Sequence, residues 1–178
     1  MVYDQQKLRQ QYRNSVNNAQ GHFFEGYIKA GCTVYHIQGR AEIDKTPEPF
    51  RVIKKNNDGT FLGRFIDHAQ PDFCGTIAGG RSICFEAKYT TTDRMKRDVL
   101  TDTQMERLEA HEKAGAVAGV CIGIKDKFYF IPWVVWRDMK SIYGRQYVTE
   151  AGIEKYRVKF NGSVLFLDYI NKDMEGSK

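Results

Sequence analysis

Long apolar runs are absent from this sequence, which argues against a membrane protein built from helices. No stretch reaches the roughly 18 consecutive apolar residues that a membrane-spanning helix requires. The first residues, Met1 to Gln6, contain no apolar signal core, so we expect no secretion by that route and predict a cytoplasmic protein without membrane contact. Internal repeats and low-complexity tracts are absent too, which leaves an ordinary globular chain.

The sequence also lacks the ligand spacings of common zinc sites. Its four cysteines include no Cys-x-x-Cys pair, and its four histidines show no ligand spacing. We expect the cysteines to be small reduced residues of the core or surface of a cytosolic protein, and we assign the histidines no role. These residues are Cys32, Cys74, Cys84, Cys121, His22, His36, His68 and His111.

The length and amino-acid composition fit one globular domain. The 178 residues are 42% hydrophobic and 28% charged, and a domain of this size buries roughly 70% of the surface that its unfolded chain exposes. We predict a single domain over residues 1–178, with a frayed polar tail at 171–178. The net charge of +5 is compatible with a polyanionic partner, although many basic proteins bind no nucleic acid.

Hydrophobic periodicity predicts helices and strands in alternating groups. Apolar residues at three- and four-residue steps predict a helix over residues 4–30 that Gly31 ends. Thr101 and Gln104 have the spacing of a capping box, which predicts a second helix up to about Ala114. We expect strands at residues 67–74, 81–89, 116–124, 128–131 and 164–170. This order indicates a mixed α/β fold.

A basic hairpin is predicted between residues 50 and 65. Two β-branched and aromatic segments flank Asp58-Gly59, a dipeptide favoured in tight turns. Such a hairpin could protrude and meet DNA phosphates, or it could be an ordinary surface hairpin, and both interpretations stay open. Its cationic side chains are Arg51, Lys54, Lys55 and Arg64.

Two acids and a lysine form the strongest chemical signal. Asp72 and Glu86 are 14 positions apart on segments that we expect to pair, so their carboxylates can converge at one end of a sheet. Lys88 shares a strand face with Glu86 because side chains alternate along a strand. Carboxylates hold partly hydrated Mg²⁺, and a lysine can orient or deprotonate the attacking water or stabilise developing charge. We predict Asp72, Glu86 and the carbonyl oxygen of Ala87 as ligands of Mg²⁺, with Mn²⁺ as the alternative cation.

Two further residues are candidates for the same site. Glu25, late in the first predicted helix, could hold water on the metal or bind a second cation. Gln104 could position the water or a phosphate, or it could only complete the capping box. An acid-x-lysine pair on a strand more often lies on a solvated face, so this short motif identifies a nuclease site only together with the surrounding sequence.

That context resembles a known nuclease family. Pro71-Asp72 followed by Glu86-Ala87-Lys88 resembles the PD-(D/E)XK motif, and further segments resemble the RecU branch of that superfamily. The similarity runs in order over about residues 15 to 170. The segments that carry it are 21–25, 41–49, 72–75, 83–88, 100–115 and 121–131.

The resemblance implies a restriction-endonuclease-like fold, in which helices flank a mixed central sheet and a hairpin protrudes as a stalk. It also implies a homodimer that cuts four-way (Holliday) DNA junctions with Mg²⁺, and it makes residues 50–65 the stalk that enters the junction. The residues that the resemblance implies as catalytic are Glu25, Asp72, Glu86, Lys88 and Gln104.

Some features depart from the family pattern and leave the substrate open. Pro71 stands where bacterial members carry threonine, the stalk is short, and the N-terminal segment is only weakly basic, which is compatible with a divergent phage-encoded member. One alternative is a nuclease of the same superfamily that cuts linear duplex. Others are a non-catalytic DNA-binding protein on the same fold, and a structural protein whose charges merely face solvent.

Overall fold

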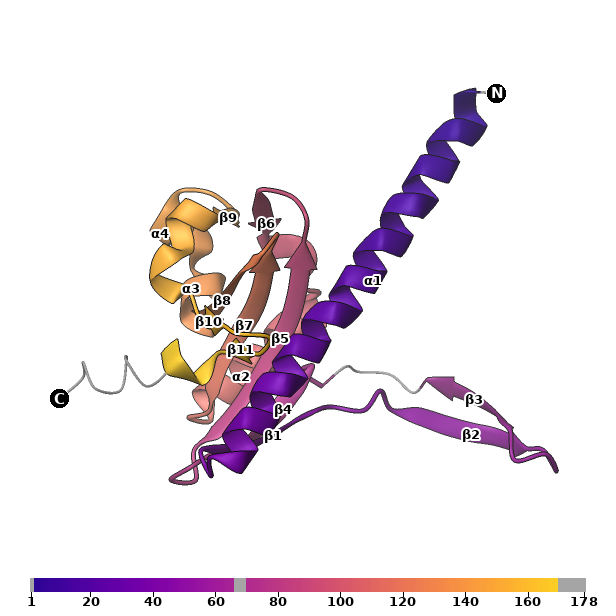
Figure 1. Ribbon diagram of the computed structural model, residues 1–178, viewed down its shortest axis with the longest axis horizontal. Coiled ribbons are helices and arrows are strands. Elements are labelled where there is room, and N and C mark those ends of the chain that lie inside the picture. Colours follow the sequence, from indigo (N-terminus) through magenta and orange to yellow (C-terminus); the bar gives the residue numbers. More distant parts are fainter. Residues whose placement is uncertain (1, 66–69, 170–178) are drawn as a thin grey trace.

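A five-stranded mixed sheet forms the centre of the computed structural model (Figure 1), which describes residues 2–65 and 70–169, and side chains at 19–64 and 70–169. The strand order is β1-β4-β5-β7-β8; β5 and β7 are parallel and every other neighbouring pair is antiparallel. The bounds are β1 Ala41–Lys45, β4 Phe73–Ile77, β5 Ser82–Thr90, β7 Val117–Ile124 and β8 Lys127–Pro132.

Helices cover both faces of this sheet. Helix α1 (Val2–Ile37) packs on one face with β10 (Lys159–Phe160) and β11 (Val164–Leu165). The opposite face carries α2 (Asp102–Lys113) and a group of short elements. That group is α3 Trp133–Arg137, α4 Met139–Tyr143, β6 Arg94–Lys96, β9 Tyr147–Thr149, and the 3₁₀ helices η1 Arg97–Val99 and η2 Glu150–Tyr156. The predicted mixed central sheet flanked by helices is confirmed.

Strand β5 shows how the sequence pattern creates the two faces. Ile83 and Phe85 are fully buried in the cluster beneath α1, and Phe85 stacks on Phe73 of β4 with ring centroids 5.2 Å apart. Alternation along the strand therefore turns Cys84 and Glu86 toward α2. Both are buried, which leaves Glu86 as a carboxylate inside the protein.

The predicted end of the first helix at Gly31 is wrong, because α1 continues to Ile37. Gly31 lies where the helix meets β11, and a Cβ atom at this position would be only 2.3 Å from the carbonyl oxygen of Val164. The glycine thus permits a close approach between two backbones rather than stopping the helix. The chain turns at Gly39 instead, whose φ of +64° suits glycine.

Two predicted strands are shorter than expected. Strand β4 begins only at Phe73, and residues 67–69 of the segment predicted as 67–74 lie outside the described residues. Strand β11 ends at Leu165, and residues 167–169 are helical. This change of direction allows the Leu167 backbone N–H to donate to the hydroxyl of Tyr35 at 3.0 Å. The tail at 171–178 lies outside the described residues.

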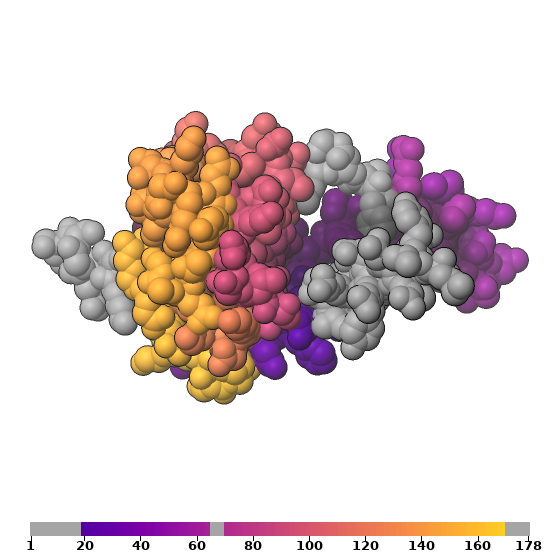
Figure 2. All heavy atoms as spheres, turned by 90° about the horizontal axis from the view of Figure 1, so that it is seen from above, coloured from indigo at the N-terminus to yellow at the C-terminus, as the bar shows by residue number. Residues whose placement is uncertain are grey.

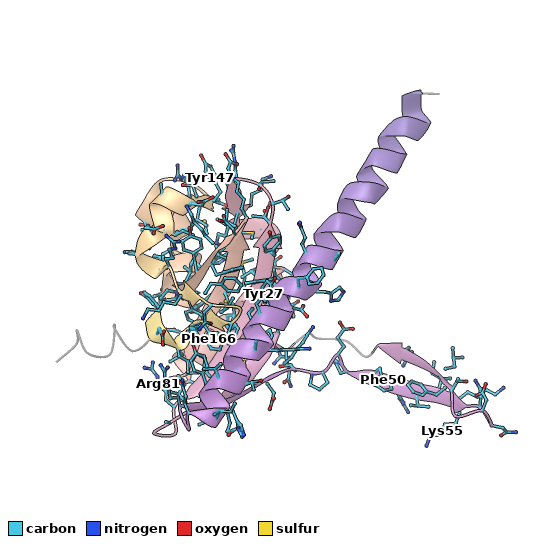
Figure 3. All side chains as sticks on the ribbon, in the orientation of Figure 1. Tyr27, Phe50, Lys55, Arg81, Tyr147 and Phe166 are labelled. Atoms are coloured by element: carbon cyan, nitrogen blue, oxygen red, sulfur yellow. The ribbon has the colours of Figure 1, made fainter. Side chains whose placement is uncertain are left out.

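The predicted hairpin is confirmed and projects from the body of the molecule (Figures 1 and 2). Strands β2 (Phe50–Lys55) and β3 (Phe61–Phe65) pair, every residue of β2 is exposed, and Gly59 turns the chain with φ +85°. Figure 3 shows Phe50 nearer the base of the hairpin and Lys55 nearer its tip. In the described part of the chain, no helix is both long and apolar enough to cross a bilayer.

Candidate active site

Asp72 lies where the pairing of β4 with β5 ends. The ladder begins with Phe73 opposite Phe85, and at the next position the Asp72 side chain accepts the backbone N–H of Ala87 at 2.9 Å. Thr46 fixes the preceding turn, because its N–H donates to the Asp72 carbonyl oxygen at 2.9 Å and its hydroxyl donates to the Pro71 carbonyl oxygen at 2.7 Å. The carboxylate of Asp72 is thereby directed toward the centre of β5.

Glu86 is the centre of the polar cluster. Its side chain is 0% exposed, and its Oε2 accepts from Gln104 Nε2 at 2.6 Å and from Lys88 Nζ at 3.4 Å. Lys88 Nζ also lies 4.0 Å from Asp72 Oδ2. The structure therefore brings together Asp72, Glu86, Lys88 and Gln104, as the sequence predicted.

The environment of Glu86 favours a partner of positive charge. Burial, the largest cause, and the neighbouring Asp72 carboxylate together raise the pKa of Glu86 from 4.5 to about 8, against the opposing effect of the Lys88 ammonium. The second oxygen, Oε1, is buried and has no hydrogen-bond partner among the described residues. A buried carboxylate oxygen without a donor, facing a second carboxylate, fits a bound divalent cation.

Gln104 completes the predicted capping box and also contacts the acidic cluster. Its Oε1 accepts from the Thr101 backbone N–H at 3.1 Å and its own N–H donates to Thr101 Oγ1 at 3.3 Å, which completes the capping box of α2. Its Nε2 is left to bind Glu86. Both contacts form at once because a side-chain amide has one acceptor end and one donor end.

Glu25 is held differently from the other predicted site residues. It lies in α1 and forms an ion pair with Lys45 of β1. Lys45 stands opposite Phe73, the neighbour of Asp72, on the α1 side of the sheet. Our sequence analysis missed this lysine, although its position in the alternation after Ala41 and Ile43 could have shown that it faces α1.

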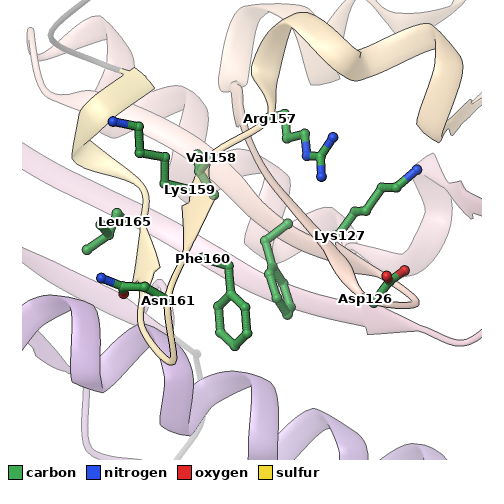
Figure 4. Close-up of a pocket in the computed structure, with 9 residues that line it drawn as sticks. Asp126, Lys127, Arg157, Val158, Lys159, Phe160, Asn161 and Leu165 are labelled. Carbon is green, nitrogen blue, oxygen red and sulfur yellow. The ribbon is translucent and has the colours of Figure 1, made fainter.

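A separate open cavity of about 600 Å³ lies beside β8 and the β10–β11 hairpin (Figure 4). Two of its cations are already paired, Lys127 with Glu150 at 2.6 Å and Arg157 with Glu154 at 3.0 Å. None of the predicted site residues lines it, so the acidic cluster remains the candidate site. The lining residues are Asp126, Lys127, Phe128, Arg157, Val158, Lys159, Phe160, Asn161 and Leu165.

The raised pKa of Glu86 predicts how the metal-free protein responds to pH. Because the fold favours the protonated carboxyl, this contribution to stability is complete below pH 4.5 and is lost as the pH rises toward about 8. In urea unfolding with a chelator, the loss should be up to roughly 1.4 kcal/mol per pH unit within that window.

Glu86→Gln should remove this slope, since it replaces the titrating group with a neutral one of similar size. Glu106→Gln, which changes an exposed acid of α2, serves as the matched control and should keep the slope. A Glu86→Gln protein with the wild-type pH dependence would contradict the assignment.

Comparison with known proteins identifies the family of this chain. No curated protein matches the chain. The solved structure of Hjc from Archaeoglobus fulgidus, titled a Holliday junction resolvase from an archaeal hyperthermophile, is similar with 12% identity and a TM-score of 0.46, and the match covers 80% of this chain and 97% of Hjc. The family model of recombination protein U matches residues 19–172. The chain therefore belongs to the recombination protein U (RecU) family, the Holliday-junction resolvases that its motifs resemble.

Proposed function

We propose that this chain cuts four-way DNA junctions with a divalent cation held at Asp72 and Glu86. The RecU family resolves Holliday junctions with the help of divalent metal ions, which supports the substrate and the cation dependence. The single observation that carries the site assignment is the buried Glu86 carboxylate, which has one unpartnered oxygen beside a second acid.

The proposed ligands are the carboxylates of Asp72 and Glu86 and the carbonyl oxygen of Ala87. A donor set made only of oxygen suits Mg²⁺, and Mn²⁺ accepts the same ligands. When bound, such a cation supplies a nucleophilic water at neutral pH and offsets negative charge on the phosphodiester.

The remaining side chains act on the water, the phosphate and the ligands. Lys88 is 23% exposed, so its ammonium can donate to a phosphate oxygen or hold the attacking water while staying close to Glu86. Gln104 fixes one oxygen of Glu86 and leaves the other available. We assign Glu25 a contribution from the α1 side, where it holds Lys45 next to the strand end that carries Asp72.

The stalk is the proposed contact with the junction backbone. Arg51 and Arg64 stand directly opposite each other in the hairpin, a like-charge pairing that destabilises strands unless an anion lies between the charges. Among the described residues, no ion pair neutralises these arginines or Lys54 and Lys55. DNA phosphates would supply the missing charge.

Assembly and location extend the proposal. Two symmetric cuts across a junction require two active sites, which supports a homodimer related by a twofold axis. We further propose that residues 1–178 form one nuclease domain, and that the protein meets its DNA in the cytoplasm.

Asp72→Asn should reduce Mg²⁺-dependent cutting of a four-way junction by about 10²-fold or more, since one of two charged ligands is lost. Junction binding should change little, because the stalk is unaltered. Cleavage rates and gel-shift affinities should be compared with those of Glu106→Gln, an exposed acid outside the cluster.

Unchanged cutting by Asp72→Asn would remove the proposed active site. The substrate is tested in the same assay with a matched linear duplex: equal rates on both DNAs would favour the alternative of a duplex nuclease. Binding by the wild type without cutting in either Mg²⁺ or Mn²⁺ would favour a non-catalytic DNA-binding protein.

The double variant Lys54→Gln/Lys55→Gln should bind the junction more weakly and with less dependence on salt. Each lost phosphate contact lowers the slope of log K against log salt by about 0.9, so a change of about 2 is expected. Lys140→Gln, at an exposed lysine of α4, should leave the slope unchanged. Equal slopes for the double variant and the wild type would contradict the stalk's role.

A further inference from the structure

Two cysteines and a histidine converge beneath the acidic cluster. The ligand atoms of Cys74, Cys84 and His111 all lie within 4.8 Å of one another, and Cys84 Sγ is 3.7 Å from His111 Nδ1. Both cysteines are free thiols. Cys84 is buried, and the other two side chains are half-buried.

The sheet brings the two sulfurs together. Cys74 and Cys84 stand directly opposite each other in the antiparallel ladder of β4 and β5. Each is two residues from a carboxylate of the acidic cluster, because Asp72 precedes Cys74 and Glu86 follows Cys84. Since side chains alternate along a strand, the two cysteines and Glu86 share the α2-facing side.

Helix α2 supplies the third group by the same logic. His111 follows Gln104 by seven residues, which is close to two helical turns, so both side chains lie on one stripe of α2. The helix thus directs Gln104 to Glu86 and His111 to Cys84. The result is two adjacent tiers on one face of the sheet, of which the first offers oxygen and the second offers sulfur and nitrogen.

The distance between the sulfur and nitrogen atoms of the second tier suits a cation with tetrahedral coordination. Zinc binds thiolate sulfur at about 2.3 Å and imidazole nitrogen at about 2.0–2.1 Å, which places sulfur and nitrogen about 3.6 Å apart around one ion. The observed 3.7 Å between Cys84 Sγ and His111 Nδ1 matches this value. Three protein ligands of this kind leave a fourth position for water.

We propose that Cys74, Cys84 and His111 form a second metal site, which takes a borderline or soft divalent cation of the Zn²⁺ class. The donor set excludes Mg²⁺, which prefers oxygen ligands, so the two tiers select different ions. An ion in this site ties β4, β5 and α2 together, and these three elements position Asp72, Glu86 and Gln104. The site does not depend on the nuclease assignment, because its ligands are separate.

Cobalt(II) is the probe for this site, because thiolate ligands give Co²⁺ an intense near-ultraviolet charge-transfer absorption that oxygen ligands lack. The full chain is reduced with a phosphine, stripped of metal and titrated with Co²⁺ in excess Mg²⁺. We expect thiolate absorption that saturates at one Co²⁺ per chain and disappears when Zn²⁺ is added.

Single substitutions locate the ion. Cys74→Ser and His111→Gln, both at half-buried positions, should each abolish or shift the absorption. Cys32→Ser, which changes a buried thiol of α1, and Asp72→Asn should retain it. No thiolate absorption in the wild type would overturn the proposal. So would absorption that is unchanged in both Cys74→Ser and His111→Gln, or that is lost in Asp72→Asn and kept in His111→Gln.

Discussion

The candidate site depends on a carboxylate that the sheet takes out of water. Glu86 lies in the middle of β5, just beyond the last residue that pairs with β4, and it pairs with Val120 of β7. The side chain is 0% exposed. A charge in such a place is costly unless a cation or several donors compensate for it. Lys88 and Gln104 satisfy only one of the two oxygens.

The elements around Glu86 position the other members of the polar cluster. The end of β4 replaces a backbone hydrogen bond with the Asp72 side chain, and so brings a second acid to the same place. The capping box starts α2 at the position from which Gln104 reaches the carboxylate. Helix α1 covers the opposite face, where it packs against Ile83 and Phe85 of the same strand. The ends of β4 and α2 therefore position the side chains of the polar cluster around Glu86.

The local patterns in the sequence predicted the parts of the site that local rules control. Alternation along β5 placed Glu86 and Lys88 on one face, and the spacing of Thr101 and Gln104 identified the helix start. Such local rules do not predict contacts between segments that lie far apart in the sequence. Gly31 was predicted to end the helix. The actual requirement for glycine at this position is the close approach of the Val164 carbonyl oxygen, which belongs to a segment far along the chain.

The same limit explains two other differences. Cys84 and His111 show no ligand spacing in the sequence, because a strand register and a helix packing bring them together. Alternation could have placed Lys45 on the α1 face, but it could not show that Glu25 lies within reach, since that depends on how α1 packs on β1. The family resemblance filled part of this gap by suggesting which distant segments meet, and the match over residues 19–172 confirms that resemblance.

The central claim is that Asp72 and Glu86 share a divalent cation. Anomalous diffraction from crystals of the protein soaked in Mn²⁺ tests it most directly. We expect a peak between the two carboxylates, within coordination distance of both and close to the Ala87 carbonyl oxygen. Strong Mn²⁺ peaks elsewhere on the molecule, with none between Asp72 and Glu86, would contradict the account.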